Sequence, residues 1–111
     1  MKYDCGKPRF DLLIPEFTEQ MAKVMELGTR KYAENSWQSV PNGRSRYTAA
    51  LHRHLNAWQQ GERLDSESGC SHMAHVAINA MFLSYFENNN GPCTMAEGNM
   101  VTGDLFGGSY E

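Results

Sequence analysis

The chain lacks the features of a membrane-embedded, secreted or multidomain protein. Its 111 residues leave room for one compact domain and little else. No apolar run approaches the roughly 20 residues that a transmembrane helix needs, because the longest apolar stretch, residues 76–86, is interrupted by Asn79 and Ser84. The first residues, Met1-Lys2-Tyr3-Asp4, lack the apolar core of a signal peptide, so we expect a cytoplasmic protein without membrane contact.

Cysteine is scarce. The three cysteines, Cys5, Cys70 and Cys93, cannot all pair within one chain, and no two of them stand in a Cys-x-x-Cys motif. A scaffold held together by disulfides and a zinc site built from thiolates are therefore both poor explanations of this sequence.

Positive charge is absent from the C-terminal part of the chain. All ten Lys and Arg lie at or before Arg63, together with seven Asp and Glu, whereas residues 64–111 hold six Asp and Glu and no Lys or Arg. A duplex-binding module normally has a net basic domain or a dense basic stripe, and the net charge here is −3. The distribution disfavours extended nucleic acid and favours a small anionic ligand, with acids or His nearby for a cation.

The first predicted helix covers residues 15–32, after an extended N-terminal segment over residues 1–14. Pro15 supplies the fixed backbone angle that suits the first helical position. Apolar or small residues then recur at helical spacing and predict the face that packs inward. These residues are Phe17, Met21, Val24, Met25 and Gly28.

The second predicted helix covers residues 46–60, with Ser45 as its cap and Gly61 as its stop. Its predicted inner face follows the same spacing as that of the first helix. The residues of this face are Tyr47, Leu51, His54, Leu55 and Trp58.

The third predicted helix covers residues 71–86, with Ser71 as its cap. It is apolar nearly all round, so we expect it to be central. A run of Asn, Gly and Pro ends it, and the tail beyond holds five of the ten glycines. We therefore predict an all-α fold, a small bundle of three main helices over residues 1–87, with a Gly/Asn-rich tail over residues 88–111 that is mobile or orders against a partner.

A line of polar residues crosses the apolar third helix. His72, His75 and Asn79 are spaced i, i+3 and i+7, which places them on one side of the helix. Buried polar groups without partners cost about 1–3 kcal/mol each, and neutral imidazoles one turn apart can hold a cation. Two interpretations stay open: a metal or ligand site made of His54, His72 and His75, or a core in which His75 and Asn79 bond to backbone groups or loop acids.

Several acids are candidates for the same site. Asp65 and Glu67 precede the third helix and could orient its imidazoles, or they could simply favour the start of the helix through its dipole. Glu16 and Glu19 form a Glu-x-x-Glu turn that can hold Mg²⁺ or Mn²⁺, although acids are common in a first turn. Glu26 lies near the apolar stripe and is a candidate for an inward carboxylate.

The basic residues that could bind an anion are Lys7, Arg9, Arg30, Lys31, Arg46 and Arg53. Lys31-Tyr32 and Asn35-x-Trp37 place a cation, aromatic faces and an amide within seven residues. Such a set can stack a base and hydrogen-bond its edge. Aromatic residues at a helix end also commonly close a core, so both roles remain open for Trp37.

Five groups of residues with fixed spacings carry a family resemblance. They are Gly6-Lys7-Pro8-Arg9-Phe10-Asp11-Leu12-Leu13 followed by Pro15-Glu16, Gly28-x-x-Lys31-Tyr32-x-x-Asn35-x-Trp37, Arg46-Tyr47, Arg53-His54-x-x-x-Trp58-x-x-Gly61-Glu62 and Asp65-x-Glu67-Ser68-Gly69-x-x-His72-x-x-His75-x-x-x-Asn79. Over about residues 6–86 the chain resembles the phage dATP/dGTP diphosphohydrolase N-terminal-domain family. The resemblance implies a small all-α domain related to the MazG-like pyrophosphohydrolases, which split a nucleoside triphosphate into monophosphate and pyrophosphate, usually with Mg²⁺ or Mn²⁺.

The sequence departs from the MazG-like pattern at one point. Those enzymes carry a Glu-x-x-Asp turn on a later helix, where this chain has His72-x-x-His75. Imidazoles suit Zn, Fe, Co, Ni or Mn better than Mg²⁺, which prefers oxygen. The departure leaves two hypotheses, an enzyme that uses a transition metal and a protein that binds nucleotide without cleaving it.

We predict, as the leading hypothesis, a metal-dependent pyrophosphohydrolase of phage nucleotide metabolism that acts on dATP or dGTP and forms a homo-oligomer, because three helices are a thin scaffold. A divalent cation (Mn, Mg, Zn or Co) is held by His54, His72 and His75. The predicted catalytic residues are Asp65, Glu16 and Glu26, and the predicted nucleotide-binding residues are Lys7, Arg9, Lys31, Asn35, Trp37, Arg53 and Asn79. The alternative is a non-catalytic phage protein that sequesters a host nucleotide signal.

Overall fold

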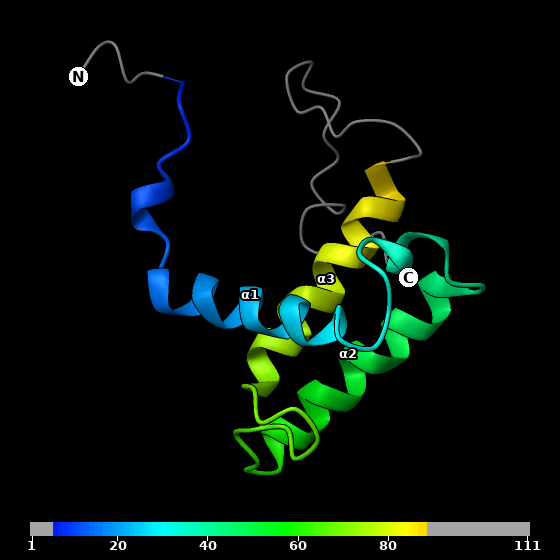
Figure 1. Cartoon of the computed structure of the whole chain (residues 1–111). Coiled ribbons are helices and arrows are strands. Elements are labelled where there is room, and N and C mark those ends of the chain that lie inside the picture. The colour runs from blue at the N-terminus through cyan, green and yellow to red at the C-terminus, as the bar shows by residue number, and fades with distance from the viewer. Residues whose placement is uncertain (1–5, 89–111) are drawn as a thin grey trace, which may run out of the picture.

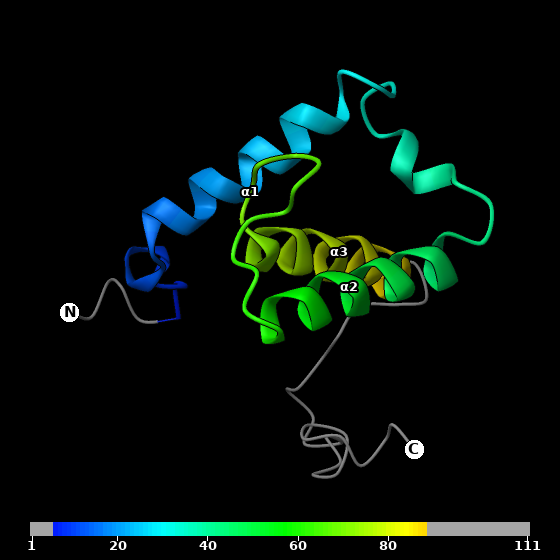
Figure 2. The ribbon, with the colours of Figure 1, turned by 90° about the horizontal axis from the view of Figure 1, so that it is seen from below.

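The computed structural model describes residues 6–88 and shows an all-α protein. Its three α-helices are α1 (Pro15–Gly28), α2 (Gly43–Gln59) and α3 (His72–Asn88), and two short 3₁₀ helices are η2 (Phe10–Leu12) and η3 (Ser36–Ser39). Helices α2 and α3 lie side by side, while α1 crosses α3 (Figures 1 and 2). The prediction of three helices is confirmed. The predicted tail lies, from residue 89 onward, outside the described residues.

The N-terminal segment is less extended than predicted. Backbone hydrogen bonds of 3.1 Å from the N–H groups of Leu12 and Leu13 close a single 3₁₀ turn. This segment leads away from α2 and α3 beyond the start of α1 (Figure 1). Its side chains Phe10, Leu12, Leu13 and Ile14 are 61–75% exposed, so a row of apolar surface remains uncovered here.

Helix α1 begins at Pro15 as predicted and ends at Gly28, four residues before the predicted end. The N–H groups of Arg30 and Lys31 bond to carbonyls three residues back, both at 3.1 Å, which tightens the backbone into turns. The apolar side chains of the predicted inner face are half-buried, but Gly28 is exposed. This loose packing leaves space between the C-terminal end of α1 and the other helices.

Helix α2 begins earlier than predicted, at Gly43, and Ser45 lies inside it rather than capping it. Asn42 adopts the left-handed conformation, with φ 56°, immediately before the helix. Gly43 is buried because α3 approaches closely there: a Cβ at this position would lie 3.1 Å from Cζ of Phe86. The absence of a side chain at Gly43 therefore decides how closely the start of α2 packs against α3.

Gly61 ends α2 as predicted. Its φ of +103° lets its N–H donate to the Trp58 carbonyl at 2.9 Å, and the Glu62 N–H donates to the Ala57 carbonyl at 3.1 Å. This pair of bonds is a Schellman motif, which needs a left-handed residue at that point. Trp58 itself is 46% exposed, so its assignment to the inner face is wrong.

Helix α3 is the central helix, as predicted. Among the described residues, the buried non-glycine side chains are Ala74, Ile78, His72 and Asn79, all of them on α3. Its cap is also confirmed, since the Met73 N–H donates to Ser71 Oγ at 3.1 Å. The buried core thus holds two polar side chains beside two apolar ones.

An aromatic cluster fixes η3 against α2 and α3. The rings of Trp37 and Phe82 stack with centroids 4.3 Å apart, and the Tyr47 hydroxyl donates to the Trp37 carbonyl at 2.9 Å. Tyr85 and Phe86 meet Trp37 edge-on. Over residues 6–88, no helix has the length and apolar character to cross a membrane.

Candidate functional site

A tight loop between α2 and α3 carries the acidic part of the candidate site. Leu64 and Ser71 form an isolated antiparallel bridge, and the Asp65 N–H donates to the Cys70 carbonyl at 2.8 Å. The loop turns at Gly69, whose φ is +75° and whose N–H donates to the Asp65 carbonyl at 2.7 Å. A residue with a side chain is strained in that conformation. The loop therefore holds Asp65 at one defined place beside the helices.

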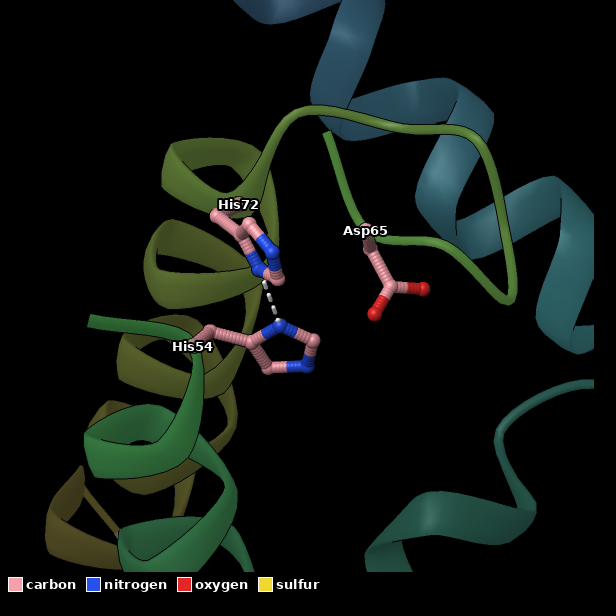
Figure 3. A group of neighbouring side chains, drawn as sticks. All are labelled: His54, Asp65 and His72. Carbon is pink, nitrogen blue, oxygen red and sulfur yellow. Dashed lines mark hydrogen bonds between the residues drawn. The ribbon is translucent and has the colours of Figure 1, made fainter. Parts of the chain in front are cut away.

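Two imidazoles and this carboxylate meet where α2, α3 and the loop converge. His54 of α2, Asp65 of the loop and His72 of α3 each offer a ligand atom, and these atoms lie within 4.8 Å of one another. The Nδ1 atoms of His54 and His72 are 2.9 Å apart (Figure 3). We call His54, Asp65 and His72 the ligand group.

The far side of the His72 ring faces a second carboxylate. Its Nε2 atom is buried and lies 3.3 Å from Glu62 Oε1, but it makes no hydrogen bond of good geometry. Metal-binding imidazoles commonly present one nitrogen to the ion and the other to a carboxylate, which orients the ring. The placement of Glu62 matches that arrangement, with Nδ1 of His72 facing the ligand group.

His75 lies beside the ligand group. Its Nε2 is 2.8 Å from Ser68 Oγ and 3.9 Å from Asp65 Oδ2. Its ring stacks on that of His54 with centroids 4.2 Å apart and planes 5° apart. The structure thus brings Asp65 together with His54 and His72, where the sequence analysis had placed His75 in the ligand set.

The electrostatics favour uncharged rings and a charged acid. Burial lowers the pKa of the His54 imidazole to about 4; neighbouring His75 adds to this shift, and Asp65 opposes it only in part. Burial likewise lowers the pKa of His75. For Asp65, burial alone would raise the pKa, but bonds from Ser68 and the adjacent imidazoles outweigh it, so the pKa is lowered. Metal ligands must be deprotonated, and the lowered pKa values of His54 and Asp65 favour that state at neutral pH.

The donor set fits a divalent transition metal. Two nitrogens bound to one tetrahedral ion at about 2.1 Å lie roughly 3.4 Å apart, so the Nδ1 atoms of His54 and His72, which are hydrogen-bonded at 2.9 Å, would have to separate slightly to bind one. Two imidazoles and one carboxylate suit Zn, Co or Mn better than Mg²⁺. The ligand group is therefore a candidate site for such an ion.

A pocket of about 770 Å³ adjoins the site, within the range of small-molecule pockets. His54 of α2, Asp65 of the loop and His75 of α3 line one side of the pocket. The turns after α1 add polar and aromatic side chains. The cationic, amide and aromatic side chains of the lining include Lys31, Tyr32, Asn35, Trp37, Arg46 and Asn79. Lys31 Nζ lies 3.5 Å from Glu67 Oε2, an exposed pair that also lines this pocket.

Several predicted site residues are not brought to the pocket. Lys7 and Arg9 belong to the exposed segment before α1, where Arg9 pairs with Asp11 at 2.7 Å. Glu16 and Glu26 are exposed on α1, and Arg53 is exposed on α2, outside the residues that line the pocket. Glu16 and Glu26 are exposed because they lie off the half-buried stripe of α1, the helix that packs on α3.

Asn79 and Trp37 line the pocket and also have partners in the core. Asn79 Nδ2 donates to the His75 carbonyl at 2.8 Å, which is the backbone bond that the second interpretation of the polar line expected. Trp37 stacks on Phe82, as an aromatic residue that closes a core does. Both residues therefore line the pocket and also stabilise the helices around it.

Ser68 and Glu62 appear in the sequence only as members of the family motifs, and neither was predicted to belong to the site. Ser68 touches both Asp65 and His75, and Glu62 faces the buried nitrogen of His72. An Asp-x-x-Ser-Gly sequence is a signal for an Asp side chain that bonds to a nearby backbone N–H, and it could have identified Ser68. Glu62 gave no such signal because its position depends on how α2 ends.

Fold and site together define a small all-α domain with a candidate metal group opening on a ligand pocket. The sequence model of one family, described as "dATP/dGTP diphosphohydrolase, N-terminal", matches residues 1–95, and the chain belongs to this family. It is 35% identical over 89 residues to a protein of Salmonella phage PMBT28 named "dATP/dGTP diphosphohydrolase". That match covers 80% of this chain but 30% of the relative, so the chain corresponds to less than a third of that protein. No solved structure matches it.

Proposed function

We propose that this chain provides the metal-binding and nucleotide-binding site of a hydrolase that cleaves dATP or dGTP to monophosphate and pyrophosphate. The observation that carries the proposal is the pocket that His54 and Asp65 line together with Lys31 and Arg46. Family membership and the name of the phage relative support the class of substrate. We also propose that the protein acts in phage nucleotide metabolism, in the cytoplasm of the host.

The reaction adds water across a phosphoanhydride bond, and each part of the pocket has a distinct task. Lys31 and Arg46 offset the negative charge of the phosphates. A divalent cation, when bound by the ligand group, supplies Lewis-acid polarisation and lowers the pKa of a bound water. Asp65, a carboxylate at pH 7 because its pKa is lowered, can accept the proton released from water. Tyr32 and Asn35 can stack and hydrogen-bond the purine.

We further propose that the chain assembles with copies of itself. Phe10, Leu12, Leu13 and Ile14 are exposed apolar side chains of one short segment, and exposed apolar patches in folded proteins commonly mark contact surfaces. Few side chains among the described residues are fully buried, as expected of a domain that gains stability from association.

A second candidate function is nucleotide binding without cleavage. The Nδ1 atoms of His54 and His72 are close enough to hydrogen-bond each other, so the two rings can satisfy one another with no cation. A protein built in this way would keep the pocket and its Lys and Arg while lacking the hydrolytic step.

The test is turnover by the full chain. We would incubate it with dATP, dGTP, dCTP and dTTP in the presence of Mn²⁺, Co²⁺, Zn²⁺ or Mg²⁺ and separate the products by chromatography. The matched pair of variants is His54→Gln and His52→Gln, since His52 is an exposed residue on the same helix. Release of monophosphate and pyrophosphate by the wild type and His52→Gln, but not by His54→Gln, supports the hydrolase. Unchanged nucleotide that co-elutes with the protein supports the binding protein.

A further inference from the structure

Ser68 connects the loop half of the site to the helical half. Its backbone N–H donates to Asp65 Oδ2 at 2.8 Å, and its Oγ lies 2.8 Å from Nε2 of His75. The same Oγ accepts the N–H of Cys70 at 3.1 Å. A half-buried residue thus bonds to two neighbours that both line the pocket.

The hydrogen-bonding of this hydroxyl constrains the His75 ring. A serine hydroxyl has one proton to donate and two lone pairs that accept. The Cys70 N–H occupies one lone pair, and the shortest remaining contact of Oγ is to His75 Nε2. When the hydroxyl donates its proton there, Nε2 is an acceptor and the ring proton is on Nδ1.

We infer that Ser68 is a positioning residue that fixes His75 as the Nδ1–H tautomer, with Nε2 as the acceptor, while its N–H holds the Asp65 carboxylate in place. One residue then sets the relative position of Asp65 on the loop and His75 on α3. Because the His75 ring stacks on His54, a fixed His75 ring also restricts the orientation of the His54 ring in the ligand group. This inference deepens the proposed function, on which it rests, because it concerns the same pocket.

Variants at Ser68 separate its backbone contact with Asp65 from its hydroxyl contacts. Ser68→Ala keeps the backbone N–H that holds Asp65 and removes the hydroxyl contacts, of which the one with His75 is the shortest. Ser68→Thr keeps the hydroxyl and should restore the behaviour of the wild type. Ser66→Ala, at an exposed position two residues away, is the matched control for the loop.

The first experiment needs neither metal nor turnover. Long-range ¹H–¹⁵N NMR spectra of the metal-free full chain at pH 8 report which nitrogen of each neutral imidazole carries the proton. We expect His75 to show an unprotonated Nε2 in the wild type, Ser68→Thr and Ser66→Ala, and a mixture of tautomers in Ser68→Ala. A protonated Nε2 in the wild type, with the hydroxyl turned toward Asp65, would overturn the inference, as would an unchanged His75 in Ser68→Ala.

The second experiment measures the affinity for Co²⁺ by competition with a coloured chelator. Loss of a group that orients the residues around a metal commonly costs 10–100-fold in affinity, so we expect Ser68→Ala to bind Co²⁺ at least about tenfold more weakly, with Ser66→Ala unchanged. Equal affinities in Ser68→Ala and the wild type would contradict the role of Ser68 at the site. If the wild type binds no Co²⁺, the proposed function fails, and the NMR result still decides the tautomer.

Discussion

The imidazoles of His54 and His75 lie parallel, with centroids 4.2 Å apart and planes 5° apart. The stack joins α2 to α3, and His72 adds a third ring to it through the 2.9 Å contact with His54. Two protonated rings in that arrangement would repel each other at close range. Burial and the neighbouring His75 ring lower the pKa of His54, and this makes the stability of the protein sensitive to pH.

Acid should destabilise the fold through His54. Its pKa is about 4 in the folded chain and about 6.5 in an unfolded one, so between those values the unfolded state binds more protons and the free energy of unfolding falls as the pH falls. Because His54 is only partly buried, we expect a loss of about 1–2 kcal/mol rather than the full linkage value. His75, whose pKa is shifted in the same direction, adds to the loss.

Urea unfolding at pH 7.5, 6 and 4.5 measures this effect. His54→Gln should show a smaller loss of stability between pH 7.5 and 4.5 than the wild type, and the exposed His52→Gln should behave as the wild type does. A His54→Gln curve with the full acid dependence of the wild type would show that another group is responsible.

The cations of the pocket should govern affinity for phosphate. Lys31→Met and Arg46→Met each remove a positive charge from the pocket lining, and we expect each to weaken dGTP binding about tenfold, which corresponds to about 1.4 kcal/mol. Binding of deoxyguanosine, which has no phosphate, should change little. Calorimetric titration checks this, with Lys23→Met on α1, which lies outside this pocket, as the control. Equal dGTP affinity in all three variants would place the phosphates elsewhere.

Close packing at the start of α2 should make Gly43 sensitive to substitution. A Cβ in Gly43→Ala would lie 3.1 Å from Cζ of Phe86 and 3.3 Å from Cε2 of Tyr47, and overpacking of this kind commonly costs about 1–3 kcal/mol. Gly28→Ala is the matched control, since a Cβ there meets nothing within 4 Å. Thermal unfolding should show a lower midpoint for Gly43→Ala alone. An unchanged midpoint would mean that Phe86 moves aside freely.

The apolar N-terminal segment should mediate self-association. Replacing Leu12 and Leu13 together by Ser removes exposed apolar surface without touching the buried part of the bundle, so we expect a smaller assembly with unchanged helical circular dichroism. Light scattering coupled to size-exclusion chromatography measures the mass, and Met81→Ser, at another exposed apolar position, is the control. A wild type that is monomeric at all concentrations would contradict the proposed assembly.

Much of the fold was predictable because its signals are local. Pro15, Gly61 and Ser71 act through the backbone of their own or adjacent turns, so the sequence alone indicated what they do. The start of α2 was not predictable, since Gly43 is selected by the approach of Phe86 from a helix more than 40 residues away. A local rule favoured Ser45 as the cap, and tertiary packing overrode it.

The site could be predicted only in part, for a geometric reason. Residues three apart on a helix point in directions about 60° apart. Because of this difference, His72 contacts His54 and lies beside Glu62, whereas His75 contacts Ser68. The place of Asp65 depends on the turn at Gly69 and on the bridge between Leu64 and Ser71. Spacing along the chain indicated which residue types gather here, but not which of them face one another.

The most direct test of the account is the metal content of the full chain after loading with Co²⁺ or Mn²⁺ and removal of the excess. The account predicts close to one ion per chain in the wild type and in His52→Gln, and far less in His54→Gln and Asp65→Asn. Equal metal content in all four proteins, or none in any of them, would contradict a site formed by His54, Asp65 and His72.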